Sequence, residues 1–179
     1  MASKAEQAFA VWITGLPACG KSTIAGFVKN LLEEHGVDAA VLESDVLRKI
    51  LSENPQYGEQ DREAFYHRLT WIGVLLTQHG VPVIFDATAN RRVYRDEARR
   101  QIPRLVEVFV DVPLQTCIER DPKGIYRSAS EGRARDVPGM QTPYEPPESP
   151  DLTIDGVRET PLDAARRIVA VLVDRHYVK

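Results

Sequence analysis

The chain has 179 residues, of which 43% are hydrophobic and 27% charged, and these proportions exclude a disordered, collagen-like or fibrous protein. The length suits one domain and is enough to bury about 70% of the surface that the unfolded chain exposes. Because the net charge is −3, nucleic-acid binding by bulk positive charge is not expected, and any anionic ligand must be held by a local basic cluster.

The sequence predicts neither a secreted nor a membrane-spanning protein. Two cysteines, Cys19 and Cys117, cannot form a disulfide framework, so a reducing cytoplasm fits better than secretion. Residues 1–7 are polar and lack the apolar core of a signal peptide. No apolar run approaches the roughly 18 residues that a membrane-spanning helix needs.

Short apolar runs alternate with helical apolar patterns along the chain. In order, the patterns predict a strand at 8–14, a helix at 21–35, a strand at 39–42, a short helix at 46–51, a helix around 66–79, a strand at 81–85, a helix at 93–102, a strand at 106–112, a short helix at 114–120, a strand at 152–154 and a helix at 162–172. This alternation predicts a three-layer α/β/α domain with a mostly parallel, five-stranded sheet. In such sheets ligands bind beyond the carboxyl ends of the strands.

One proline-rich segment interrupts the alternation. Residues 121–150 hold six of the twelve prolines and show little apolar periodicity. Loops of this length inside a compact domain are usually functional or disordered. Two interpretations stay open: an unstructured excursion, or a lid at about 121–150 that closes over substrate within a single domain spanning 1–179.

The most specific motif is a phosphate-binding loop. Residues 15–22 fit G-x-x-x-x-G-K-[ST], directly after a predicted strand and at the start of a predicted helix. Backbone N–H groups and the helix N-terminus favour bound phosphate there, Lys21 would reach the β- and γ-phosphates, and the Ser22 hydroxyl would ligate Mg²⁺. The motif therefore predicts a nucleoside triphosphate with Mg²⁺, held by Gly15, Leu16, Pro17, Ala18, Cys19, Gly20, Lys21, Ser22 and Thr23. Within the loop, the Cys19 side chain is either a small filler or an oxidation-prone thiol.

Two aspartates follow predicted strands. Asp45 follows the second strand and could accept the proton of an attacking hydroxyl or hold a magnesium-bound water; alternatively it caps the helix at 46–51. Asp86 ends the third strand, where it is either a second magnesium partner or a turn residue.

The arginines divide by position. Arg48, Arg62 and Arg92 lie near predicted strand ends or helix starts, and planar guanidinium groups bind phosphate or sulfate with two hydrogen bonds, so these three are candidate anion ligands. The next three share a predicted helix with two acids and are expected on a solvated face; they are Arg95, Arg99 and Arg100.

Several further motifs occur together in the chain: Ile-Thr-Gly-Leu-Pro at 13–17, Asp45 with Arg48, Asp61-Arg62, Val-Phe-Val-Asp-Val-Pro-Leu at 108–114, Arg-Asp-Pro-Lys-Gly-Ile-Tyr at 120–126, and Pro-Tyr-Glu-Pro-Pro at 143–147 with Pro150. In these motifs the chain, from about Val11 to the C-terminus, resembles the adenylylsulfate (APS) kinases, which transfer the γ-phosphoryl group of ATP to the 3′-hydroxyl of adenosine 5′-phosphosulfate (APS). The last two segments lie in the proposed lid and are far more specific than a phosphate loop alone.

The resemblance implies a P-loop kinase fold with a mobile lid, and ATP with Mg²⁺ as the bound cofactors. Asp45 would be the catalytic base, Arg48 and Arg62 would bind substrate, Lys123 would face the phosphates from the lid, and Arg120 would lie against the ATP adenine. A homodimer is common in the family, so the resemblance allows one here.

The acceptor side departs from the family pattern. Glu-Ser-Asp-Val at 43–46 replaces Asp-Gly-Asp-Asn and keeps only the second acid, and Phe65 replaces an asparagine. Ala-Asn-Arg-Arg at 89–92 replaces Ser-Pro-Tyr-Arg and keeps only Arg92 as a substrate ligand. Val137 stands where the family has a phenylalanine that stacks on the substrate adenine. Phe65 is therefore the candidate for the missing stack, with core packing against Leu69 as its alternative.

Three functions remain as hypotheses. The first is an APS kinase, and the second is an APS-kinase-like phosphotransferase for another small alcohol; residues 86–90 look like those of sugar and polynucleotide kinases. The third is a nucleotide-binding switch without transferase activity, against which the lid and Asp45 argue, because a switch needs no acceptor base.

Overall fold

A computed structural model describes residues 7–52 and 57–179 of the chain. Five strands form one sheet with the order β2-β3-β1-β4-β5, and every neighbouring pair is parallel. The strands are β1 (Ala10–Thr14), β2 (Ala40–Glu43), β3 (Val83–Asp86), β4 (Leu105–Asp111) and β5 (Leu152–Asp155). The predicted α/β class with a five-stranded parallel sheet is confirmed.

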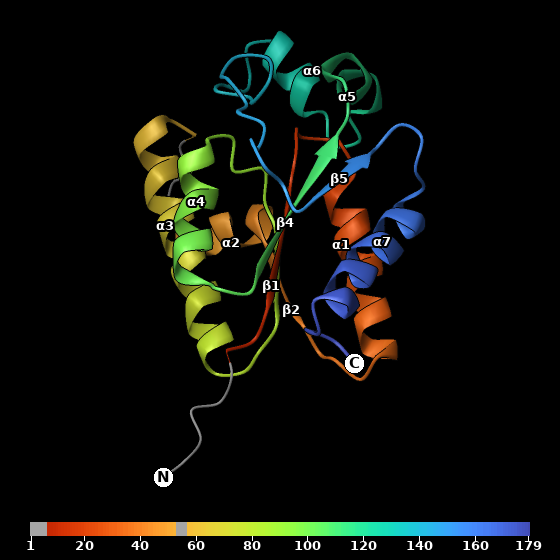
Figure 1. Ribbon diagram of the computed structural model, residues 1–179. Coiled ribbons are helices and arrows are strands. Elements are labelled where there is room, and N and C mark those ends of the chain that lie inside the picture. The colour runs from red at the N-terminus through yellow and green to blue at the C-terminus, as the bar shows by residue number, and fades with distance from the viewer. Residues whose placement is uncertain (1–6, 53–56) are drawn as a thin grey trace.

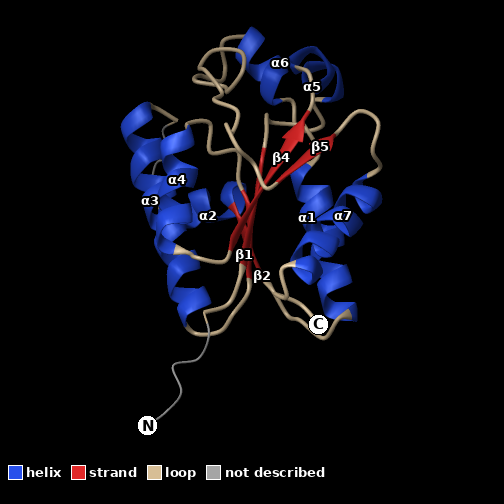
Figure 2. Cartoon of the chain, in the orientation of Figure 1, coloured by secondary structure: helices blue, strands red, loops and turns tan. Residues whose placement is uncertain are grey.

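Helices cover both faces of the sheet (Figure 1). On one face lie α1 (Lys21–Glu34) and α7 (Pro161–Asp174), and on the other lie α2 (Ser44–Leu51), α3 (Glu59–Gln78) and α4 (Arg92–Gln101). Two short helices, α5 (Leu114–Arg120) and α6 (Ile125–Ser130), lie beyond the carboxyl ends of the strands, with the strands between the two helical layers (Figure 2). Within the described ranges no helix has the length and apolar character needed to cross a membrane.

The central strand β1 is apolar because both of its faces are covered. All five of its residues are buried. Val11 and Ile13 pack into the cluster beneath α1 and α7, whereas Ala10 and Trp12 pack into the cluster beneath α3 and α4. This alternation of side chains follows from the pleat of the strand and explains the continuous apolar run in the sequence.

Two helices begin earlier than the apolar pattern predicts, since their first turns are polar. The helix expected around Tyr66 begins at Glu59, so Asp61 and Arg62 lie inside it. The helix expected at 46 begins at Ser44, and its N-cap is Glu43 without a capping side-chain hydrogen bond. The capping role considered for Asp45 is therefore wrong: this residue lies in the first turn, where its negative charge suits the helix dipole.

The segment at 121–150 is folded, so its interpretation as an unstructured excursion is wrong. It contains α6 and lies across the carboxyl ends of the strands (Figure 1). Tyr126, Ala129 and Val137 are buried in the main core cluster. Tyr126 and Ala129 lie one turn apart in α6, which is too short to give a sustained helical period, and Val137 reaches the core from an irregular position.

Candidate active site

The loop after β1 adopts a conformation that only small residues allow at two points. Gly15 has a φ of 153° and Gly20 a φ of 102°. A Cβ on Gly15 would lie 2.6 Å from the Val110 carbonyl oxygen and 2.7 Å from the Cys19 Sγ. The chain therefore needs glycine at Gly15 to pass close to β4, and the buried thiol of Cys19 fills the space beside it, as a small filler would.

Lys21 folds back over this loop. Its Nζ donates hydrogen bonds to the carbonyl oxygens of Leu16, at 2.8 Å, and Gly15, at 3.2 Å, and the residue is buried. Ser22 and Thr23 follow in the first turn of α1 and are exposed. A cation and the N-terminus of a 14-residue helix thus meet at one point, which is the arrangement that binds phosphate.

The segment at 121–150 covers the loop directly. The Tyr126 hydroxyl donates to the Pro17 carbonyl oxygen at 3.0 Å, and burial raises the pKa of this phenol, so it stays a donor at neutral pH. Gly139 lies against Leu16, since a Cβ on it would come within 2.6 Å of the leucine Cδ2.

Strand register places acids beside the loop. Asp86, the last residue of β3, lies opposite Glu43 of β2 and Ile13 of β1, one residue before β1 ends. Asp86 is buried, whereas Asp45 is exposed and accepts a hydrogen bond from Lys123 Nζ at 2.6 Å. This hydrogen bond raises the pKa of Lys123, and the charges of Asp45, Asp86 and Glu43 raise it further. The fold therefore brings two predicted acids and the lid lysine together.

The donors near the loop suit magnesium held jointly with phosphate. The described residues contain no cluster of three or more histidine, cysteine or acidic side chains that could hold a metal alone. Mg²⁺ prefers oxygen ligands and usually takes one or two carboxylates with water and substrate phosphates. The Ser22 hydroxyl and the Asp86 carboxylate fit that pattern.

Among the described residues, two buried arginines, Arg48 and Arg62, have no acid as a hydrogen-bond or ion-pair partner. Arg62 donates to the carbonyl oxygen of Tyr57 at 2.6 Å, to Asn90 Oδ1 at 3.3 Å and to the Asp136 carbonyl oxygen. The Arg48 guanidinium lies 3.8 Å from the centre of the Phe65 ring. In the described parts of the chain, no carboxylate forms an ion pair with either one. Burial lowers the pKa of Arg62 and the neighbouring charge of Arg48 lowers it too, whereas the charge of Asp136 acts in the opposite direction without outweighing them.

A cavity of about 400 Å³ opens onto this charge. Its walls include Tyr57, Arg62, Asn90, Tyr94 and Glu145. The Tyr57 ring is half exposed and lies 5.1 Å from the Arg48 guanidinium. Reasoning from the sequence misses Tyr57, although an aromatic residue in a polar stretch just before Asp61-Arg62 is a signal that points to it.

The cavity walls do not include Phe65 and Arg92, predicted for the substrate, or Arg120, predicted for the ATP adenine. Phe65 is fully buried and packs with Leu69, so its core alternative is the one the structure shows. Arg92 pairs with Glu145 and Glu148. The exposed Arg120 donates to the Gly156 carbonyl oxygen at 2.9 Å, beyond the end of β5.

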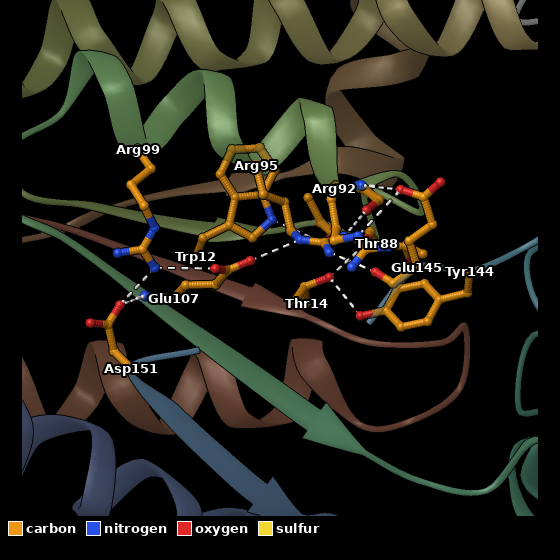
Figure 3. A network of polar contacts seen from close by, with 12 residues as sticks. Trp12, Thr14, Thr88, Arg92, Arg95, Arg99, Glu107, Tyr144, Glu145 and Asp151 are labelled. Atoms are coloured by element: carbon orange, nitrogen blue, oxygen red, sulfur yellow. Dashed lines mark hydrogen bonds and ion pairs between the residues drawn. The ribbon is translucent and has the colours of Figure 1, made fainter. Parts of the chain in front are cut away.

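A buried network clamps residues 143–151, which we call the strap (Figure 3). Arg95 donates to Glu107 Oε1 at 2.8 Å, to the Glu145 carbonyl oxygen at 2.6 Å and to the Ala89 carbonyl oxygen. The Tyr144 hydroxyl lies 3.0 Å from Thr14 Oγ1, just before the phosphate loop.

The solvated face expected for Arg95 is therefore wrong. Only 2% of Arg95 is exposed, because Glu107 points from the middle of a buried strand and needs a cation beside it. Arg99 and Arg100 are both exposed as expected, although Arg99 also pairs with Glu107 and with Asp151. An acid inside the apolar run at 106–112 is the sequence signal for this pairing.

A parallel sheet with a phosphate-binding loop after its central strand and helices on both faces defines a P-loop nucleotide-binding protein. The model of the adenylylsulphate kinase family matches residues 7–155. The chain belongs to this family.

Individual relatives support the assignment to this family. The adenylyl-sulfate kinase of Synechococcus sp. (strain JA-2-3B'a(2-13)) is 36% identical over 168 residues, which cover 94% of this chain and 96% of the relative. The adenylyl-sulfate kinase of Rippkaea orientalis is 35% identical over 97% of this chain and 96% of its own length. The structure of the Mycobacterium tuberculosis APS kinase in complex with AMPPNP and APS superimposes with a TM-score of 0.87 and 33% identity, covering 93% of this chain and 98% of that one.

Proposed function

We propose that this protein transfers the γ-phosphoryl group of ATP to the 3′-hydroxyl of APS, with Mg²⁺. The observation that carries the proposal is the pair of buried arginines, Arg48 and Arg62, which have no acid partner among the described residues, together with the cavity that Arg62 lines. Buried charge without a partner is costly, so such a pocket is suited to an anionic ligand. APS supplies both a phosphate and a sulfate.

The family relationship favours this acceptor over another alcohol. A related kinase of the same family has been crystallised with APS and an ATP analogue. A nucleotide switch would need neither the acceptor cavity nor an acid placed next to the loop.

We assign the nucleotide half as follows. Lys21 and the backbone of Gly15 to Thr23 hold the phosphates, and Arg120 lies near the adenine. Ser22 and Asp86 would hold Mg²⁺, and Asp45 would contact a magnesium-bound water. When bound, the ion supplies positive charge against the transferring phosphoryl group.

Asp45 acts on the acceptor. Its carboxylate takes the proton of the 3′-hydroxyl as that oxygen forms a bond to the γ-phosphorus and the bond to the β-phosphate oxygen breaks, leaving ADP. The same carboxylate holds Lys123 in the structure described here, and we propose that this lysine turns to the phosphates when nucleotide binds. The segment at 121–150 then excludes water, which limits wasteful hydrolysis of ATP.

On the acceptor side, Arg48 and Arg62 bind the phosphosulfate group, with Arg92 at the edge beside the strap. Tyr57 offers the aromatic face that the chain lacks at Val137. Phe65 contributes to acceptor binding indirectly, because its ring packs against the Arg48 guanidinium and supports it.

The test is an ADP-release assay with ATP and Mg²⁺ and a panel of acceptors that contains APS, AMP, gluconate and shikimate, with mass spectrometry of the product. We expect release that depends on APS and a product heavier by one phosphate. Lys21→Ala is the control and should lose about 100-fold or more of the rate, since it removes a cation that acts on transition-state charge. Faster release with another acceptor, or no dependence on APS, would contradict the proposal.

We further propose that the chain is a single domain with a lid at about 121–150, and that it works in a reducing cytoplasm as a monomer or homodimer. Cys19 and Cys117 are buried free thiols, and burial raises the pKa of Cys117 to about 11, which keeps it unreactive. Light scattering coupled to size exclusion measures the assembly.

A further inference from the structure

We propose that Asn90 is a positioning residue for the acceptor: it orients Arg62 with a neutral oxygen and ties that arginine to the strap. The inference rests on the proposed function and deepens it. It concerns a residue that touches no reacting atom and that acts through the arginine.

Asn90 lies between the two parts that it joins. It is 3% exposed and follows β3 by four residues. Its Oδ1 accepts from Arg62 Nη1 of α3 at 3.3 Å, and its Nδ2 donates to the Pro143 carbonyl oxygen at 3.1 Å. Its backbone carbonyl accepts from the Glu145 amide at 2.7 Å. One side chain thus sets the position of the cavity's arginine relative to the strap.

The neutrality of the amide is as important as its geometry. The other two acceptors that the described residues offer Arg62 are backbone carbonyls, so none of these three hydrogen bonds is made to a carboxylate, and the nearby charge of Asp136 acts on the guanidinium without a side-chain hydrogen bond. A carboxylate at the same place would pair with Arg62 and leave less positive charge for an anion in the cavity. An asparagine is the side chain of this size that can accept from an arginine and also donate to a carbonyl.

Asn90 lies in the segment at 89–92, where the chain departs from the family pattern Ser-Pro-Tyr-Arg. A proline in place of Asn90 has no side-chain acceptor for Arg62 and no donor for Pro143. The bridge from α3 to the strap is therefore a feature of this chain's own sequence.

Two substitutions separate orientation from charge. Asn90→Ala removes both side-chain contacts and should raise the KM for APS about tenfold, the range expected for a hydrogen bond to a charged group. Asn90→Asp keeps the size and the acceptor, yet it should raise the KM for APS at least as much because it neutralises Arg62. For both variants the KM for ATP should stay within about twofold of wild type, since nothing at the phosphate loop has changed.

A double-mutant cycle and a strap variant complete the experiment. In an Arg62→Ala background, Asn90→Ala should add less than about twofold to the KM for APS, because coupled residues are not additive. Tyr144→Phe loosens the strap at Thr14 without contacting Arg62, and it should leave the KM for APS less affected than Asn90→Ala does. Melting temperatures identify any variant that has simply lost stability.

The possible results separate failure of the proposed function from failure of the role of Asn90. Wild-type protein without APS-dependent ADP release would overturn both the proposed function and this inference. An active wild type whose Asn90→Asp variant, folded by its melting temperature, binds APS normally would overturn the inference alone. So would additive effects in the cycle, or a Tyr144→Phe variant with the same loss as Asn90→Ala.

Discussion

Arginine side chains in this protein differ in role according to what faces them. Arg95 is buried against Glu107, and Arg92 pairs with two acids of the strap. Arg62 is also buried, but the hydrogen-bond acceptors that the described residues offer it are neutral oxygens, so its charge is available to a ligand. A buried arginine therefore marks an anion site only when the groups around it leave the charge uncompensated.

For the single residue Asp45, the substitution Asp45→Asn should reduce kcat far more than it weakens ATP binding. The amide keeps the size of the side chain but cannot accept the proton, and loss of a general base typically costs about 100- to 10,000-fold in rate. Steady-state kinetics with calorimetric titration of an ATP analogue measures both quantities. A variant with near-normal kcat would move the role of base to Asp86.

Tyr57→Ala should raise the KM for APS about tenfold or more, because stacking of a base on an aromatic ring contributes about 1–3 kcal/mol. Tyr57→Phe is the matched control and should behave like wild type, since the ring is retained and the contact with Arg62 is made by the backbone oxygen. If Tyr57→Ala binds APS as wild type does, the aromatic face lies elsewhere.

Among the elements, α3 and β3 pack unusually closely. A Cβ on Gly73 would lie 2.1 Å from the Phe85 Cζ, and that ring stacks on Trp12 at 4.4 Å between centroids. The close approach of this helix sets where Arg62, near the start of the same helix, stands relative to the strand ends.

Gly73→Ala should therefore destabilise the fold by roughly 1–3 kcal/mol, the usual cost of overpacking, despite the better helix propensity of alanine. Gly26→Ala in α1 is the control: a Cβ there meets nothing within 4 Å, so this change should be neutral or stabilise by up to about 1 kcal/mol. Urea unfolding measures both free energies of unfolding. Equal effects at the two sites would show that α3 can move away from Phe85 at no cost.

For the whole molecule, one aspartate joins elements from both layers to the sheet. Asp151 accepts from the Glu107 amide of β4, from Arg99 of α4 and from Arg175, which follows α7. Burial alone would raise the pKa of Asp151, but these hydrogen bonds and charges outweigh it and hold the pKa below its ordinary value of 3.8.

Because this pKa is lowered by folding, ionised Asp151 stabilises the protein above the ordinary pKa, and that stabilisation falls as the pH drops below it. Asp151→Asn should consequently be less stable than wild type near pH 7, and the difference should narrow at about pH 3. Denaturant unfolding at both pH values tests this, with the exposed Asp38→Asn as control. A difference that does not change with pH would mean that packing, and not ionisation, is lost.

The sequence by itself determined the features that are local. The phosphate loop lies within eight consecutive residues, the strands and all the helices except α6 follow in outline from the spacing of neighbouring apolar residues, and alternating strands and helices favour a parallel sheet. Because parallel strands end at one edge, their order along the chain is also enough to predict that Asp45 and Asp86 lie near the loop.

Only the tertiary structure determined which residues come together on the acceptor side of the site. There the contacts join residues far apart in sequence, such as Arg62 with Asn90, 28 positions away, and with Asp136, 74 positions away. No periodicity links such pairs. The sequence therefore leaves the burial of Phe65 as one of two alternatives, and the signals at Tyr57 and Glu107 do not say which side chains lie beside them. These side chains owe their roles to which other chain segment packs beside them, and that is settled only when the helices close on the sheet.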